Sequence, residues 1–131
     1  LESVIDAVSS PRLADAGTPM GVATSRRRDT ATALLDAAGL AVHLPLLVGL
    51  EDTDDHKPDA APLLLAADRL GIESGEAVYV GDAVVDLQAA RAAGMTGVGV
   101  TWGAGLPALL RAQPSHAVVD TVPELEVALG A

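Results

Sequence analysis

The chain has 131 residues, with 18 acidic and 8 basic side chains, a formal net charge of −10 and no cysteine. This length predicts a single domain over residues 1–131, with a core that needs neither a disulfide nor structural zinc. The acidic charge argues against nucleic acid as a partner, because phosphate backbones are repelled. No apolar run approaches the ~20 residues of a membrane span, and the first residues lack a basic leader. We therefore expect a soluble, cytoplasmic protein without membrane contact.

Short apolar runs alternate along the chain with segments of helical spacing. In order, they predict a helix at 1–8, a strand at 20–24, a helix at 30–38, a strand at 46–50, an acidic loop at 51–57, a helix at 60–70, a strand at 77–80, a helix at 84–93, a strand at 97–101, a helix at 106–111, a strand at 117–119 and a helix at 123–129. Asp29 is an expected N-terminal cap, and Thr121 forms a capping-box pair with Glu124.

The predicted strands are short, apolar on both faces and separated by helices. This pattern is typical of a parallel sheet that is covered by helices on both sides. The expected fold class is therefore α/β, a three-layer Rossmann-like sheet. In such folds, ligands bind at the carboxyl ends of the strands, so the residues that follow each strand are the ones to consider.

Polar residues of four kinds follow these strands. Thr24 and Ser25 follow the first strand, and Lys57, the only lysine in the chain, ends the acidic loop after the second. Asp82 and Asp86 come after the third strand, four residues apart at the start of a helix. A hydroxyl and an ammonium suit phosphoryl oxygens, and paired carboxylates suit Mg²⁺. Together they indicate a phosphoryl-transfer site that lacks its nucleophile.

Each of these residues also has a structural interpretation. Thr24 is then an ordinary hydroxyl at a strand end, Lys57 a surface lysine, Asp82 a helix cap and Asp86 a solvated helix residue. The three consecutive arginines, 26–28, either offset nearby acidic groups or meet an anionic substrate, and the first interpretation is favoured. His43, His56 and His116 show no metal-ligand spacing, and Trp102 is expected to pack in the core.

The order of four segments resembles the haloacid dehalogenase-like hydrolases, and most closely their phosphoglycolate phosphatase-like branch. The segments are GVATS, HKPDAAPLLLAADRLGI, VYVGDAVVDLQAARAAGM and GVGVTWG, and the resemblance spans residues 16–103. It implies that Thr24 holds a phosphoryl oxygen, with Ser25 as a less favoured neighbour, and that Lys57 steadies the nucleophile and the phosphoryl group. It also implies that Asp82 binds Mg²⁺ and that Asp86 supports or shares the metal site.

The sequence departs from the family pattern in two places. Ala83 stands where the family usually has Ser or Thr, which is a small change. The larger departure is the absence of the first family motif, an Asp-x-Asp followed by Gly-Thr, whose first Asp is the nucleophile. Asp52 and Asp54 also follow a strand, but no Gly-Thr comes after them, so they are a weak substitute. Asp120 follows the last strand without a paired acid and is weaker still.

In the family, the strand that carries this first motif lies between the strands that end here at Thr24 and Val80. Without it, the sheet must close a gap or leave two edges unpaired, and an exposed edge invites pairing with another chain. We expect that the chain pairs these strands directly, associates with itself or another partner through an edge, or is a fragment of a longer protein. The last of these is favoured.

The favoured function is that of a Mg²⁺-dependent phosphatase acting on a small phosphorylated metabolite through an aspartyl-phosphate. The catalytic residues expected in this chain are Thr24, Lys57 and Asp82, and turnover by these residues alone is expected to be very weak or absent. One alternative is an inactive remnant that binds Mg²⁺, phosphate or a protein. Another is a phosphoacceptor signalling domain, which the placement of Lys57 one strand after Thr24 disfavours.

Overall fold

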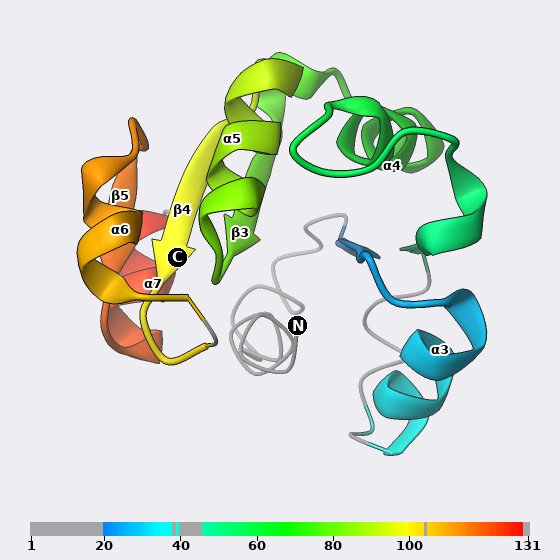
Figure 1. Ribbon diagram of the computed structural model, residues 1–131, viewed down its shortest axis with the longest axis horizontal. Coiled ribbons are helices and arrows are strands. Elements are labelled where there is room, and N and C mark those ends of the chain that lie inside the picture. The colour runs from blue at the N-terminus through cyan, green and yellow to red at the C-terminus, as the bar shows by residue number, and fades with distance from the viewer. Residues whose placement is uncertain (1–19, 38, 40–45, 104, 130–131) are drawn as a thin grey trace.

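A computed structural model describes residues 20–37, 39, 46–103 and 105–129. Its elements, shown in Figure 1, are β1 (Gly21–Ala23), α3 (Arg28–Ala37), β2 (Leu46–Val48), η1 (Leu50–Asp52), α4 (Ala61–Leu70), η2 (Ser74–Glu76), β3 (Val78–Gly81), α5 (Val84–Ala93), β4 (Thr96–Val100), α6 (Pro107–Ala112), β5 (Ala117–Val119) and α7 (Val122–Ala128). The predicted helix at 1–8 and His43 lie outside the described residues.

Each strand and helix predicted within the described residues is present, with boundaries that move by a few residues. The helices α4 and α5 end at glycines in the left-handed conformation, Gly71 with φ 73° and Gly94 with φ 74°, as expected of helix stop signals. Thr121 caps α7, where its side chain accepts the N–H of Glu124 at 3.3 Å. The Thr121 half of the predicted capping box is therefore confirmed, while the Glu124 carboxylate accepts from the Thr121 hydroxyl at 3.0 Å.

The start of α3 differs from the prediction that Asp29 caps it. The helix begins at Arg28, two residues before the predicted start, and Asp29 lies in its first turn. The reason is a carboxylate from another part of the chain, because Glu51 Oε1 accepts the N–H of Arg28 at 2.8 Å. A contact from Glu51, 23 residues away along the chain, thus replaces the expected cap by Asp29.

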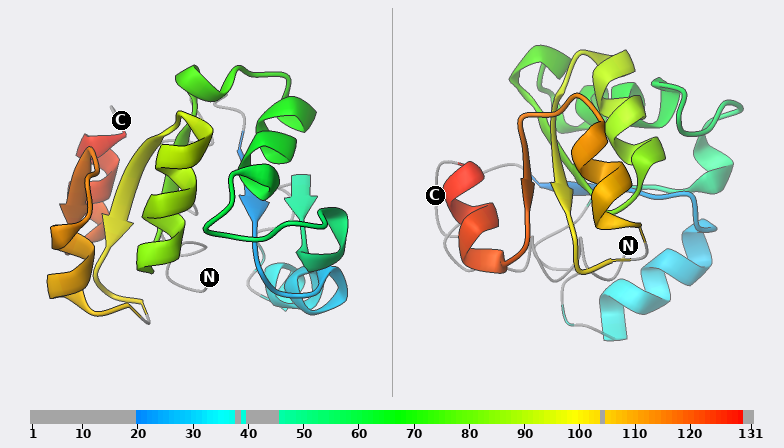
Figure 2. Two further views of the ribbon diagram at one scale, coloured as in Figure 1. Left: turned by 45° about the horizontal axis from the view of Figure 1, so that its top comes forward. Right: turned by 60° about the vertical axis from the view of Figure 1, so that its left-hand side comes forward.

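All strand pairs are parallel and form two sheets within the described part of the chain. One has the order β1-β2 and the other the order β3-β4-β5. Helix α4 packs on β1 and β2, and α5 packs on β3 and β4. In the right-hand view of Figure 2, α7 lies on one face of the second sheet, and α5 and α6 lie on the other. The expected α/β class with helices on both faces is confirmed.

Between the two sheets the described strands leave a break. Over residues 20–37, 46–103 and 105–129, β1 pairs with β2 alone and β3 pairs with β4 alone, so neither strand pairs with the other. A cavity of about 790 Å³ occupies this position, lined by β1, β3 and the inner face of α4. Of the outcomes expected for the sheet, the described residues show two separate edges rather than direct pairing.

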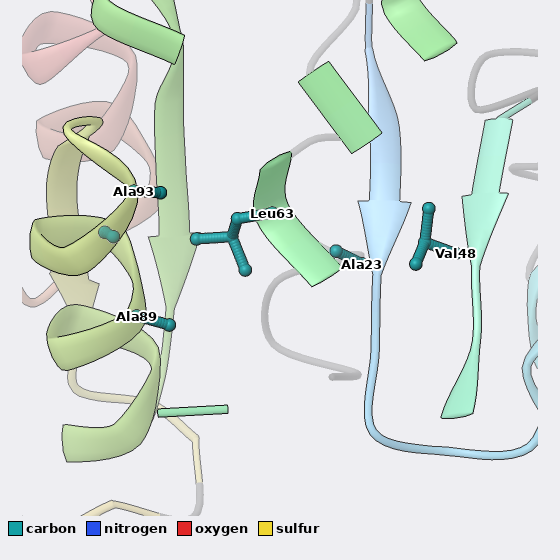
Figure 3. Close-up of a cluster of buried hydrophobic side chains, with 6 residues drawn as sticks. Ala23, Val48, Leu63, Ala89 and Ala93 are labelled. Atoms are coloured by element: carbon teal, nitrogen blue, oxygen red, sulfur yellow. The ribbon is translucent and has the colours of Figure 1, made fainter. Parts of the chain in front are cut away.

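The two sheets are joined on one face by the packing of α4 against α5. Leu63 of α4 is 1% exposed and lies between the two sides. Figure 3 shows it between Ala23 and Val48 of the first sheet and Ala89 and Ala93 of α5. Small alanine side chains let the helices approach closely, so one leucine fills the space between them.

None of the helices in the described residues has the length and apolar character to cross a lipid bilayer.

Replacing Leu63 by alanine is expected to lower the free energy of unfolding by about 2–5 kcal/mol, because it opens a cavity where the two sheets are joined. The matched control is Leu64→Ala at the adjacent position, which is 45% exposed and should cost less than about 1 kcal/mol. Chemical denaturation of both variants measures the difference. Equal losses would show that Leu63 does not hold the two sheets together.

Candidate functional site

The structure brings the five sequence-predicted site residues to one end of the cavity. Its lining includes Thr24 and Ser25, which follow β1, Asp82, which follows β3, and Lys57 and Asp86. The carboxyl ends of the two facing strands therefore contribute to the same site, as expected for ligand binding in a parallel α/β fold. These polar groups are therefore the candidates for the chemistry of the cavity.

Lys57 and Asp86 form a buried ion pair at this site. Lys57 Nζ lies 2.6 Å from Asp86 Oδ1, and the two side chains are 10% and 6% exposed. The other carboxylate oxygen, Asp86 Oδ2, accepts the backbone N–H groups of Asp82 and Ala83, each at 3.1 Å. Asp86 therefore holds both the lysine and the backbone around Asp82. The structural interpretation of Asp86 as a solvated helix residue is wrong.

Gly81 makes this position of Asp86 available. A Cβ atom at Gly81 would overlap the Asp86 side chain, so only glycine allows the carboxylate to lie against the end of β3. The next residues turn the chain into α5, whose N-cap is Ala83. Alanine has no side-chain acceptor, and the Asp86 carboxylate receives the Ala83 N–H instead. The absence of Ser or Thr at position 83 therefore leaves this helix start intact. Because Ala83 is the N-cap of α5, the interpretation of Asp82 as the helix cap is wrong.

Tyr79 is the site residue that sequence reasoning missed. Its hydroxyl donates to the carbonyl of Ala23 at 2.8 Å and accepts from Lys57 Nζ at 3.1 Å. The lysine nitrogen also lies 5.5 Å from the centre of the tyrosine ring, within the range of a cation–π contact. Tyr79 lies in a strand whose sequence pattern predicts an apolar core position. The only sequence signal for a polar contact was its hydroxyl, which needs a hydrogen-bond partner when buried.

The environment of this cluster shifts two pKa values. Burial raises the pKa of Tyr79 to about 12, although the nearby Lys57 ammonium opposes the shift. Burial alone would lower the pKa of Lys57, but Tyr79 and Asp86 outweigh it and the net pKa is raised. The lysine is therefore a stable cation and the tyrosine a stable neutral hydroxyl across the physiological pH range.

Thr24 and Ser25 differ in how they meet the cavity. Thr24 is 6% exposed, and its Oγ1 accepts the backbone N–H of Arg26 at 3.1 Å. That contact uses a lone pair, so the Thr24 hydroxyl proton remains a donor for an anion. Ser25 is exposed, and its hydroxyl is less fixed by its surroundings. Of the two neighbouring hydroxyls, Thr24 is thus the buried one and Ser25 the exposed one.

Two of the three consecutive arginines pair with acidic groups. Arg27 lies 3.8 Å from Asp29, and Arg28 Nη2 lies 2.5 Å from Asp52 Oδ2 and donates to the Leu47 carbonyl at 2.9 Å. The favoured interpretation, that they offset nearby acid, is confirmed for these two. Arg26 is exposed and lines the cavity, which places it at the rim of the candidate site.

The acids weighed as substitute nucleophiles have other roles in the structure. Asp52 Oδ2 accepts from Arg28 and from the N–H of Gly49 at 2.7 Å, and Arg28 holds the pKa of this carboxyl below its usual value. Asp54 is exposed. Asp120 Oδ1 accepts from Thr101 at 2.8 Å and from Arg111 at 2.6 Å. None of the three lines the cavity that holds Lys57.

The donor groups at the site fit a magnesium ion better than a transition metal. Within the described residues no group of three or more His, Asp or Glu side chains is placed to hold a metal, and His56 and His116 are both exposed. Asp82 and Asp86 offer hard carboxylate oxygens at one end of the cavity. Mg²⁺ is commonly held by one or two carboxylates, with water and substrate phosphate completing its shell. Asp86 also meets Lys57 and two backbone N–H groups, and both Asp82 and Asp86 are candidate ligands.

Comparison with known proteins identifies the class to which this fold and site belong. The family model for haloacid dehalogenase-like hydrolases matches residues 4–100. The chain therefore belongs to the haloacid dehalogenase-like hydrolase family. It is 33% identical over 114 residues to a phosphoglycolate phosphatase of Escherichia coli, and 38% identical over 111 residues to one of Xylella fastidiosa. The crystal structure of a hydrolase from Pseudomonas syringae superposes with a TM-score of 0.84 at 29% identity.

The chain spans about half the length of these relatives. The matches cover 87% of this chain and 45% of the E. coli phosphatase, and 78% of this chain and 48% of the X. fastidiosa phosphatase. The P. syringae structure covers 99% of this chain, which accounts for 59% of that structure.

Replacing Asp52 by asparagine is expected to lower the free energy of unfolding at pH 7 by about 1 kcal/mol, because Arg28 loses its charged acceptor. The folded-state pKa of Asp52 is lowered from 3.8, so its stabilising effect is present above that value and is lost as the pH falls through the folded-state pKa. The deficit of the variant should therefore shrink in acid. Denaturation at several pH values measures it.

The matched control for this prediction is Asp54→Asn, since Asp54 is exposed two residues away. It should leave the stability unchanged at every pH. A deficit that is the same at pH 7 and pH 3 for Asp52→Asn would contradict the assigned ion pair.

Proposed function

We propose that this chain forms part of a Mg²⁺-dependent phosphatase that acts on a small phosphorylated metabolite. The observation that carries the proposal is the meeting of Lys57, Asp86, Asp82 and Thr24 at one end of the cavity between β1 and β3. A buried ammonium, a buried hydroxyl and a carboxylate at a strand end suit the stabilisation of a phosphoryl group. The phosphoglycolate phosphatases among the relatives support a phosphate monoester as the substrate class.

In this proposal each residue has a distinct role. Lys57 and Thr24 donate hydrogen bonds to the phosphoryl oxygens and balance the charge that builds up on them. Asp86 keeps Lys57 in place and orients the backbone at Asp82. Asp82 would hold Mg²⁺, which when bound supplies Lewis-acid stabilisation of the phosphoryl oxygens. Ser25 stands at the rim as a secondary contact.

The nucleophile of this reaction is proposed to come from a segment other than the described residues. A carboxylate oxygen attacks phosphorus and the ester P–O bond breaks, while a general acid of the same segment gives its proton to the leaving alcohol oxygen. Water then hydrolyses the acyl phosphate to the carboxylate and inorganic phosphate. The facing edges of β1 and β3, with the 790 Å³ cavity between them, have the form of a slot for one more parallel strand that ends beside Lys57.

A first test compares the 131-residue chain with its Asp82→Asn variant in thermal melts with and without millimolar Mg²⁺. Mg²⁺ is expected to raise the melting temperature of the wild type by about 3–5 °C and that of Asp82→Asn by much less. Asp68→Asn, an exposed acid on α4, is the matched control and should retain the full shift. An equal shift in all three proteins would contradict a metal site at Asp82.

The same proteins are then assayed for Mg²⁺-dependent hydrolysis of an aryl phosphate. Little or no turnover is expected, because removal of a nucleophile from a site that acts as a unit costs orders of magnitude. Turnover that depends on Asp82 would show that a nucleophile lies within this chain. If the wild-type chain shows no Mg²⁺ shift and no turnover, the inactive remnant is favoured over the phosphatase.

The two neighbouring hydroxyls provide a second test. Thr24→Val is expected to weaken the binding of inorganic phosphate in the presence of Mg²⁺ by about tenfold, because a buried donor to the anion is lost. Ser25→Ala should change the affinity by less than about twofold, because its hydroxyl is exposed. Isothermal titration calorimetry measures both. A larger effect from Ser25→Ala would reverse the assignment of the phosphate-binding hydroxyl.

A further inference from the structure

The side chain of Tyr79 connects the two halves of the fold across the break in the sheet. Tyr79 belongs to β3, and its hydroxyl donates to the carbonyl of Ala23, the last residue of β1, at 2.8 Å. Within the described residues this carbonyl belongs to a strand edge without a strand partner on that side. The tyrosine therefore sets the distance between the two strands at the level where Thr24 follows.

The same contact decides how Tyr79 meets Lys57. A tyrosine hydroxyl has one proton, and here it is directed to Ala23. The oxygen can then only accept, and among the described residues its donor is Lys57 Nζ at 3.1 Å. With its pKa raised to about 12 by burial, the hydroxyl stays neutral and keeps this orientation at physiological pH.

Among the described residues, the contacts of Lys57 account for two of its three N–H groups. An ammonium has three N–H donors, and those of Lys57 meet Asp86 Oδ1 at 2.6 Å and the Tyr79 hydroxyl at 3.1 Å. In the described part of the chain no third acceptor contacts it. Two fixed acceptors define the direction of the remaining N–H, whereas Asp86 alone would let the ammonium rotate about one contact.

We propose that Tyr79 is a positioning residue, whose hydroxyl is held by the Ala23 carbonyl and in turn fixes the Lys57 ammonium so that its third N–H meets the phosphoryl group. The role rests on the proposed phosphatase function for the identity of the anion. The holding of Lys57 by Tyr79 does not rest on it and can be measured separately.

The first experiment uses the fact that Lys57 is the only lysine in the chain. Its acylation by a water-soluble N-hydroxysuccinimide ester is followed by peptide mass spectrometry, which separates it from the N-terminal amine. Tyr79→Phe is expected to increase the Lys57 rate by about threefold or more, because the amine loses one of two hydrogen bonds. Asp86→Asn is the positive control.

Two matched variants separate this effect from a general loss of stability. Thr101→Val removes a hydroxyl that donates to Asp120 in another part of the fold, and Leu110→Ala weakens a fully buried core position of α6. Neither should accelerate acylation as Tyr79→Phe does. A Tyr79→Phe rate equal to that of wild type, or no greater than that of Leu110→Ala, would overturn the proposal.

The second experiment is a double-mutant cycle on the affinity for inorganic phosphate with Mg²⁺. Tyr79→Phe is expected to weaken binding about three- to tenfold in the wild-type background and less than about twofold in a Lys57→Met background. Equal losses in both backgrounds would show that Tyr79 acts independently of Lys57 and would overturn the proposal. If the wild type binds no phosphate, the proposed function fails, and the acylation rates still decide whether Tyr79 holds Lys57.

Discussion

The burial of a single ammonium, that of Lys57, constrains most of the candidate site. A charged amine removed from water must be given acceptors, or it would lose its proton. Here the acceptors come from two elements, Asp86 from α5 and Tyr79 from β3. Each of these is fixed in turn, Asp86 by two backbone N–H groups and Tyr79 by the Ala23 carbonyl. The hydrogen bonds around the Lys57 ammonium thus link the loop after β2, both facing strands and the start of α5.

This network also explains how the two sheets keep their relative position, although no strand of the described residues is common to both. On one face, Leu63 of α4 fills the space between Ala23 and the alanines of α5. At the carboxyl end of the strands, the Tyr79 hydroxyl reaches the Ala23 carbonyl. The first contact is apolar and without direction, while the second is directional. Together they border a cavity of about 790 Å³, whose lining includes Thr24, Lys57, Asp82 and Asp86.

The sequence predicted the helices and strands of the described region well, because their apolar periodicity and glycine stops are local signals. It also placed Thr24, Lys57, Asp82 and Asp86 at one edge, because the carboxyl ends of parallel strands share an edge. The features it missed depend on contacts between distant segments. Glu51 replaces the local cap of α3, and Tyr79 finds its two partners 56 and 22 positions away along the chain. Neither of these contacts can be predicted from the spacing of residues that are close in the sequence.

The charge of the site bears on the need for a metal. Lys57 and Asp86 neutralise each other, Asp82 adds a second carboxylate to the lining of the same cavity, and the net charge of the chain is −10. A phosphate monoester would bring further negative charge into this surrounding, and a carboxylate nucleophile would add more. Thr24 contributes only a neutral donor, and Arg26 lies at the exposed rim. The negative charges of the site would oppose the binding of a phosphate monoester, because like charges repel more strongly where water is excluded. Under the proposed function, a divalent cation at Asp82 would offset this repulsion, so that Lys57, held by Asp86 and Tyr79, could act on a phosphoryl group.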